Sequence, residues 1–340
     1  MIKIIILSLN KFIHLIIRDR ERVFNMKNKL FYTILVGVFI AVISLVGCQS
    51  NDETNGEENT EDTIFIATSF TLIEDIVKQI GGDLVETHNL VPIGTDPHEY
   101  EPLPEDTKAV TDADGIIYNG FNLEGGDHGW LAKMVESVGK DEAVMYELME
   151  GADPLYLSDE DGEAHEINPH TFLDPVLGLH MAENTLKALI DIAPEHEEVF
   201  EENAQNYFEE LQAIDEEYEQ KINEIPEENR LLVTSERAYQ YMAKRYGLEE
   251  GFIWEIDTEE QGTPEQITSL IELVNEKQPP VLFVESNVDR RAMETVAQET
   301  GVEIFTTLYS DEIGKPGEEG DTYLKFLQYN IEQIYAGLTQ

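Results

Sequence analysis

The chain has 340 residues, of which 41% are hydrophobic and 27% charged, a composition typical of a folded protein with two domains. Its 70 acidic residues outnumber its 22 basic residues and give a formal net charge of −48. A surface of this sign repels nucleic acid and anionic lipid headgroups and attracts cations, so we expect no nucleic-acid partner.

Near the N-terminus, an apolar segment ends at the only cysteine, Cys48. Residues 30–46 follow Lys27 and Lys29, and residues 45–48 read Leu-Val-Gly-Cys. A basic stretch, an apolar stretch and small residues before a cut are typical of a secretory signal. The ending resembles a bacterial lipobox, in which the cysteine is lipidated and becomes the mature N-terminus. An uncleaved transmembrane anchor is the alternative, but the position of Cys48 favours lipidation.

The composition divides the chain into five segments. Residues 1–47 form the signal region, and residues 1–25 are interpreted as a start-site artefact because Met26 would begin a signal of ordinary length. Residues 48–62 hold the lipidated cysteine and an acidic tether, which has no apolar residue after Cys48 and is expected to be disordered. An N-terminal lobe, a linking helix and a C-terminal lobe follow at residues 63–194, 195–225 and 226–340.

Strands and helices alternate in both lobes. In the first lobe, strands are expected at residues 63–68, 83–91, 116–118 and 143–146, and helices at 72–80, 105–113, 130–138 and 176–192, with an acidic loop over 150–167. In the second lobe, strands are expected at 231–233, 252–254, 281–284 and 304–308, and helices at 238–246, 264–276, 290–300 and 323–338. This alternation predicts an α/β fold in which each lobe has a mostly parallel sheet flanked by helices.

Residues 195–225 predict one long, rigid helix between the lobes. Apolar residues recur there at gaps of three and four and form a single stripe, namely Phe200, Ala204, Tyr207, Leu211, Ile214, Tyr218, Ile222 and Ile225. Pro194 can begin the helix and Pro226 ends it. At ~1.5 Å per residue the helix would be roughly 45 Å long, enough to join two lobes. A coiled coil is the alternative, but sustained charge pairing beside the stripe is missing.

Two histidines and several carboxylates stand where an open α/β sheet binds ligands, beyond the carboxyl ends of its strands. Asp96-Pro97-His98 and Asn168-Pro169-His170 repeat one arrangement, in which a proline limits where the imidazole can point. Two such histidines in one lobe favour metal ligation over two solvated side chains. In the second lobe Glu236, Glu285 and Asp311 follow predicted strands, and spacing alone does not choose among them.

From residue 63 to its end, the chain resembles the manganese/zinc solute-binding lipoproteins of bacterial ABC importers, a family that includes proteins described as adhesins. The resemblance is carried by these stretches: Gly94-Thr-Asp-Pro-His98-Glu-Tyr100-Glu-Pro102, Asn119-Gly-Phe-Asn-Leu-Glu124, Asn168-Pro-His170-Thr-Phe-Leu-Asp174-Pro, Thr234-Ser-Glu236, residues 254–267, Val284-Glu-Ser-Asn-Val-Asp289 and Tyr309-Ser-Asp311. It implies two lobes joined by one rigid helix. It also implies four metal ligands, which fall on His98, His170, Glu236 and Asp311 and leave Glu285 without a ligand role.

The chain departs from the zinc carriers of that family in two places near the expected site. Those members often have histidine where Glu236 stands, and a histidine-rich loop where residues 153–167 hold only His165. Arg237 also replaces the usual glycine. Two neutral imidazoles and two carboxylates balance a divalent cation, and oxygen ligands suit Mn(II) while imidazoles disfavour Ca(II) and Mg(II).

We therefore expect extracytoplasmic capture of Mn(II) and its delivery to an ABC permease, by a monomer held at the cell membrane through a lipid anchor. Zn(II) or Fe(II) binding by a protein of the same kind is the first alternative, and a surface adhesin is the second. A metallohydrolase is disfavoured, because the chain has no His-Glu-x-x-His pattern and four protein ligands leave little room for a reacting water. We do not expect an enzyme.

Overall fold

The computed structural model describes residues 63–158, 164–256 and 262–340. Contacts divide the chain into Met1–Thr60 and Glu61–Gln340, and the described residues belong to the second unit. The predicted signal region, Cys48 and the tether lie outside the described residues, as do the middle of the acidic loop and residues 257–261.

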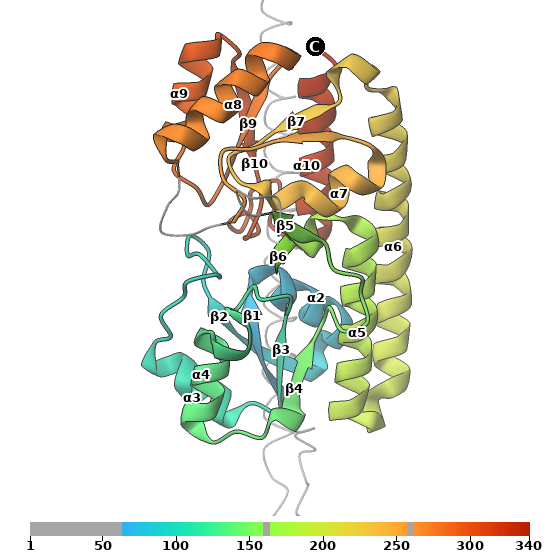
Figure 1. Cartoon of the computed structure of the whole chain (residues 1–340). Coiled ribbons are helices and arrows are strands. Elements are labelled where there is room, and N and C mark those ends of the chain that lie inside the picture. The colour runs from blue at the N-terminus through green and yellow to red at the C-terminus, as the bar shows by residue number, and fades with distance from the viewer. Residues whose placement is uncertain (1–62, 159–163, 257–261) are drawn as a thin grey trace, which may run out of the picture. The chain divides into compact units, whose positions relative to one another are not determined.

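The N-terminal lobe is built on a four-stranded parallel sheet in the order β2-β1-β3-β4. Its strands are β1 (Ile64–Phe70), β2 (Val85–Val91), β3 (Gly115–Tyr118) and β4 (Met145–Glu147). Helices α2 (Thr71–Gly81) and α5 (Pro175–Ile192) cover one face, and α3 (Pro104–Asp112) and α4 (Trp130–Val138) cover the other (Figure 1). Because both faces are covered, β1 is buried almost throughout its length, as its apolar sequence predicts.

The C-terminal lobe repeats the parallel pairing with shorter strands. Strand β7 (Leu231–Val233) pairs with β8 (Glu249–Gly251), and β9 (Leu282–Glu285) pairs with β10 (Ile304–Leu308), all in parallel. Its helices are α7 (Gln240–Tyr246), α8 (Pro264–Lys277), α9 (Arg291–Thr300) and α10 (Tyr323–Leu338). The expected α/β class, with parallel sheets flanked by helices in two lobes, is confirmed.

The linking helix is α6 (Glu197–Glu224), which follows a 3-10 turn over Pro194–His196. All eight residues of the predicted apolar stripe are buried. The helix packs against α2 and α5 of the first lobe and against α7 and α10 of the second, so it runs beside both lobes (Figure 1). Tyr218 adds a polar contact, because its hydroxyl donates to the carbonyl oxygen of Leu327 at 2.8 Å.

Two local predictions were wrong. The acidic loop contains an antiparallel pair, β5 (Tyr156–Ser158) with β6 (Ala164–Ile167). The strand expected at residues 252–254 is instead β8 at Glu249–Gly251. The apolar side chains of Ile253 and Trp254 are buried just beyond that strand, where both amides donate to the carbonyl oxygen of Ser235. The apolar residues that predicted a strand are therefore buried loop residues.

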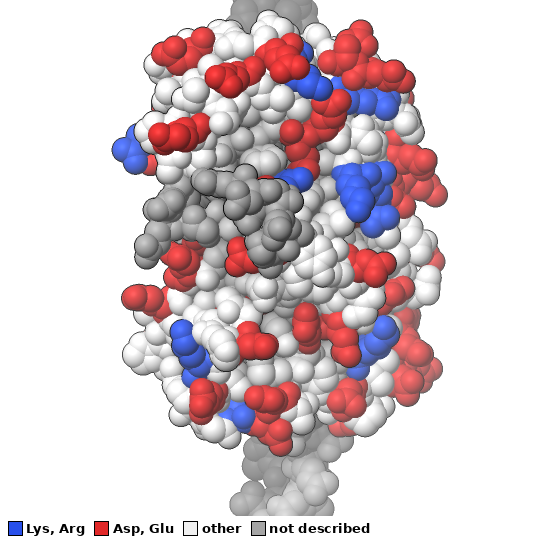
Figure 2. All heavy atoms as spheres, viewed as in Figure 1, with Lys and Arg blue, Asp and Glu red and all other residues white. Residues whose placement is uncertain are grey.

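Acidic side chains are spread over both lobes on the face shown in Figure 2 and do not gather in one patch there. This distribution agrees with a charge that serves solubility. No helix among the described residues is both long and apolar enough to cross a lipid bilayer.

Candidate metal centre

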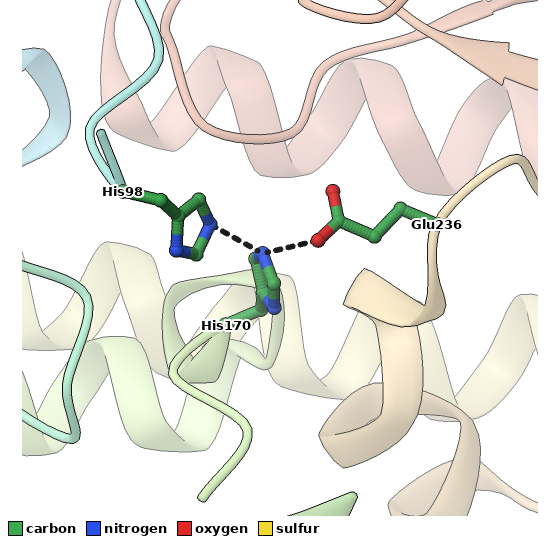
Figure 3. Close-up of side chains that lie close together, drawn as sticks. All are labelled: His98, His170 and Glu236. Carbon is green, nitrogen blue, oxygen red and sulfur yellow. Dashed lines mark hydrogen bonds and ion pairs between the residues drawn. The ribbon is translucent and has the colours of Figure 1, made fainter. Parts of the chain in front are cut away.

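His98 follows β2 in a loop with a fixed turn. The carboxylate of Asp96 accepts the His98 backbone N–H at 2.7 Å, and Pro97 fixes the backbone between them. The indole N–H of Trp130 donates to the carbonyl oxygen of Pro97 at 2.8 Å and ties the turn to α4. His98 is half-buried, and its imidazole points toward His170 (Figure 3).

His170 follows β6 and is completely buried. The side-chain oxygen of Asn168 accepts both the His170 backbone N–H, at 3.0 Å, and its Nδ1–H, at 2.7 Å. The Asn168 amide nitrogen donates to the carbonyl oxygen of Arg237 at 2.9 Å and to Gln240 Oε1 at 3.1 Å, which fixes the orientation of the amide. Nδ1 therefore carries the proton, and Nε2 is the bare nitrogen that can bind a metal.

The two carboxylates come from the C-terminal lobe, and both are buried. Glu236 follows β7, and its backbone N–H donates to Glu285 Oε1 at 2.8 Å. Asp311 follows β10, and its Oδ2 accepts the Asn287 amide at 2.7 Å. Glu285 and Asn287 thus position the two acids from the end of β9.

All four predicted side chains meet around His170 Nε2. This atom lies 3.3 Å from His98 Nε2, 3.6 Å from Glu236 Oε1 and 3.4 Å from Asp311 Oδ1. The donor atoms of His98, His170 and Glu236 lie within 4.8 Å of one another (Figure 3). Ligands at about 2.0–2.1 Å from one tetrahedral ion are about 3.3 Å apart, so the spacing of His98, His170 and Glu236 suits a shared metal ion. Asp311 is outside this group of three and adjoins it through His170.

Burial sets the protonation of the site. It lowers the pKa of His98, against a smaller opposing effect of Asp96, and it lowers the pKa of His170 well below its usual value, with His98 adding to the effect. Both imidazoles are therefore neutral, the form that binds metal. Burial, with Asp96 next in effect, raises the pKa of Asp311 to about 8. Two carboxylates close together in a buried site without a cation are unfavourable, and a divalent cation would relieve this.

Arg237, the residue that departs from the family pattern, turns its side chain away from the four donors. Its guanidinium lies 3.0 Å from Glu255 Oε1 and 3.4 Å from Glu250 Oε2, and it stacks over Phe252 with 5.0 Å to the ring centroid. Its positive charge is thus compensated by these two acids. Its backbone carbonyl oxygen, by contrast, takes part in the site through Asn168.

The structure places the four predicted donors near one another, but sequence reasoning missed the residues that position them. Asn168, Asn287 and Glu285 have structural roles that depend on contacts across loops or between lobes. Asn168 offered a local signal, because Asn-Pro-His and Asp-Pro-His both place an acceptor two residues before the histidine. Glu285, a strand-end acid like Glu236, accepts backbone N–H groups of Ser235 and Glu236 and does not join the donor set.

Two α/β lobes, a long helix beside both and a buried donor set between them define a metal-binding solute-receptor architecture. The profile of the zinc-uptake complex component A, periplasmic (ZnuA), matches residues 66–337. The chain belongs to this family. It is 43% identical over 311 residues to the manganese ABC transporter substrate-binding lipoprotein PsaA of Streptococcus anginosus, covering 91% of this chain and 98% of that protein.

Other similar relatives and solved structures are also named as metal-binding proteins. The metal ABC transporter substrate-binding lipoprotein SsaB of Streptococcus sanguinis is 41% identical, with 89% and 97% of the two chains covered. The Mn-bound periplasmic metal binding protein from Candidatus Liberibacter asiaticus superposes with a TM-score of 0.72 at 27% identity, over 81% of this chain and 99% of that one. The periplasmic zinc binding protein TroA of Treponema pallidum gives a TM-score of 0.74 at 26% identity, over 82% and 100%.

Proposed function

We propose that this protein captures a divalent transition metal outside the cytoplasm, Mn(II) first and Zn(II) second, and delivers it to the permease of an ABC importer. The observation that carries the proposal is that the His98 imidazole and the buried carboxylates of Glu236 and Asp311 lie 3.3–3.6 Å from Nε2 of the buried His170. Relatives named as manganese ABC transporter substrate-binding lipoproteins support the choice of metal and of partner.

The donor set supports Mn(II) on chemical grounds. A carboxylate, unlike an imidazole, has two oxygens that can bind one ion, so this donor set is compatible with more than four donor atoms, which Mn(II) accepts and tetrahedral Zn(II) does not need. Zn(II) still ranks above Mn(II) in raw affinity for nitrogen and oxygen ligands. Selection for Mn(II) would therefore rest on geometry and on release to the importer.

The four donors also argue against catalysis. With His98, His170, Glu236 and Asp311 all bound, a four-coordinate ion has no open position for a reacting water, which a hydrolytic metal centre requires. We accordingly assign the chain a transport role and treat the metal as cargo.

The anchor and the oligomeric state complete the proposal. Cys48 is the lipidated N-terminus of the mature protein, residues 48–62 tether the receptor to the outer face of the cell membrane, and the receptor acts as a monomer. The relatives named as lipoproteins support the anchor. Mass spectrometry of membrane-extracted protein should find an acylated Cys48 as the first residue. An unmodified Cys48, or a retained upstream segment, would refute this part.

Deleting the protein tests the function in cells. A strain without it should lose high-affinity Mn(II) uptake and grow poorly in manganese-depleted medium. The wild-type gene should restore uptake, and a His170→Ala variant expressed at the same level should not. Normal Mn(II) and Zn(II) uptake in the deletion strain, in a host with no second importer for these metals, would contradict the proposal.

A further inference from the structure

The end of β9 holds both acidic donors of the C-terminal lobe through two different contacts. Glu285 fixes the backbone before the Glu236 side chain, whereas Asn287 contacts the reactive group of Asp311 itself. Between them, the Ser286 backbone N–H donates to the carbonyl oxygen of Leu308 at 2.9 Å, which locks β9 to the strand that leads to Asp311. The position of the Asn287 amide is therefore set by the sheet.

The two oxygens of Asp311 have different surroundings. Oδ1 lies 3.4 Å from His170 Nε2 and so faces the other donors, and it also accepts the Ser310 hydroxyl in a long contact of 3.4 Å. Oδ2 accepts the Asn287 amide at 2.7 Å, and the Asp311 side chain is buried, so water does not compete for this bond. The carbonyl oxygen of the Asn287 side chain is buried without a hydrogen-bond partner among the described residues. Against the ionised carboxylate that binds a metal, the opposite amide orientation would place two acceptor oxygens together, so Asn287 acts as the donor in the metal-binding form.

We propose that Asn287 determines how many oxygens Asp311 gives to the metal, and through this the balance between Mn(II) and Zn(II). The inference rests on the proposed metal-binding function. A carboxylate must turn to bring both oxygens to one ion, and here that rotation would weaken a charge-assisted hydrogen bond in a dry environment. Asn287 therefore holds Asp311 in one-oxygen binding through Oδ1.

This restraint favours the metal that needs fewer donors. Zn(II) is satisfied by four donors in a tetrahedron, whereas Mn(II) gains from a fifth or sixth. Asn287 is thus a positioning residue that limits the preference for Mn(II). Removing its amide should free Oδ2 and shift the Kd ratio of the two metals toward Mn(II) by roughly tenfold, the size expected for one hydrogen bond to a charged group.

The test measures Mn(II) and Zn(II) affinities by competition calorimetry for the purified full-length protein and for Asn287→Leu, which keeps the branched shape of the side chain and removes the amide. Asn287→Ala is the second variant, since it also removes the donor and leaves room if leucine does not fit. Asn229→Leu is the matched control, because the Asn229 amide donates at 2.9 Å to Leu338, at the end of α10 and outside the donor set. We expect the shift in both Asn287 variants and none in the control.

Co(II) supplies a readout that a loss of stability would not move. The visible absorption of protein-bound Co(II) weakens as its coordination number rises, so the Asn287 variants should show weaker bands than the wild type, with the control unchanged. An unchanged metal ratio and spectrum, or a shift toward Zn(II), would overturn the role of Asn287. Absence of metal binding by the wild-type protein would instead refute the proposed function, so the two failures are distinguishable.

Discussion

Asn168 links the two lobes at the level of single atoms. Its side-chain oxygen accepts a hydrogen bond from His170, and its amide nitrogen donates to Arg237 and Gln240 in the opposite lobe. A partner on Nδ1 sets the tautomer of a metal-binding imidazole, and loss of such a partner typically costs about 10–100-fold in affinity. His170 is therefore pre-organised for binding through Nε2.

Asn168→Ala should weaken Mn(II) and Zn(II) binding by roughly tenfold or more, because the ring loses its tautomer and its orientation. Asn168→Asp keeps the acceptor for His170 and loses the donor to the other lobe, so it should recover part of the affinity. Nitrogen chemical shifts of His170 report the tautomer directly. Asn184→Ala, a change on α5 outside the site, is the control. Equal losses in both Asn168 variants would mean that the lobe contact dominates.

Glu236 is the residue on which the manganese assignment depends most. Glu236→His exchanges an oxygen donor for an imidazole and removes a negative charge, so Mn(II) should bind at least about tenfold more weakly while Zn(II) is retained. Competition calorimetry measures the ratio. A ratio equal to that of the wild type would show that Glu236 acts as a structural acid beside the site.

At the residue scale, sequence reasoning reached the two histidines and three candidate acids because proline-locked histidines and strand-end acids leave local patterns. The choice of Glu236 and Asp311 over Glu285 needed the family resemblance, since all three are acids after strands. What separates Glu285 is its pair of bonds to the amides of Ser235 and Glu236, almost fifty residues away in sequence, and no local pattern encodes such a contact.

At the scale of elements, a buried carboxyl holds the loop after β3. Glu124 accepts the backbone N–H groups of Asn119 and Gly120 at 2.8 and 3.1 Å, and burial raises its pKa to about 7 from an ordinary value of 4.5. The Asn119 amide then donates to the carbonyl oxygen of Pro169, directly before His170. This loop therefore supports the backbone of the site without touching the donors.

The raised pKa makes stability depend on pH. Between about pH 4.5 and pH 7 the folded protein binds a proton at Glu124 that the unfolded chain does not hold, so the free energy of unfolding should fall as pH rises through this window. The contribution is on the order of 3 kcal/mol. Glu285, whose pKa burial also raises to about 7, adds a similar slope.

Glu124→Gln should make the fall of the unfolding free energy shallower by up to about 1.4 kcal/mol per pH unit, because the amide keeps an acceptor and no longer titrates. Urea unfolding at several pH values between about 4.5 and 7 measures it, with Glu136→Gln, a change at an exposed acid of α4, as the control. A slope as steep in Glu124→Gln as in the wild type would assign the pH dependence to other groups.

Long periodic elements were the easiest to predict, and short ones the hardest. The seven stripe residues inside α6, and Ile225 just after it, are buried, because only one face of that helix meets both lobes. Strands β5 and β8, of three residues each, follow from pairing with neighbours. The charged Glu249-Glu250-Gly251 stretch forms a strand because its backbone pairs with β7, a contact that local propensity does not report.

At the scale of the whole receptor, direct contacts join the lobes near all four donors. Beside Asn168, the Glu312 carboxylate accepts the Gly94 backbone N–H, which ties the loop of Asp311 to the loop of His98. Tyr323 N donates to Asp75 at 2.9 Å and Tyr323 Oη donates to the carbonyl oxygen of Phe172 at 2.7 Å. Helix α6 contains no glycine and no proline, so it offers no hinge about which the lobes could separate.

We therefore expect little movement of the lobes on metal binding. Small-angle scattering with and without Mn(II) should give nearly the same radius of gyration. A Glu209→Gly/Glu210→Gly variant, altered at two exposed positions of α6, should show a larger difference than the matched Glu209→Ala/Glu210→Ala variant, since glycine weakens a helix by about 1 kcal/mol per residue relative to alanine. A large contraction of the wild-type protein would rule out a rigid link.

We propose that His98, His170, Glu236 and Asp311 form one site for a divalent transition metal. Titration calorimetry of the metal-free protein with Mn(II), repeated after Zn(II) loading, tests it most directly. We predict that each chain binds one Mn(II) and that Mn(II) and Zn(II) compete for the same site. The affinity for Mn(II) should fall by roughly a hundredfold in His170→Ala. Tight Mn(II) binding that survives His170→Ala, or simultaneous binding of both metals, would contradict the claim.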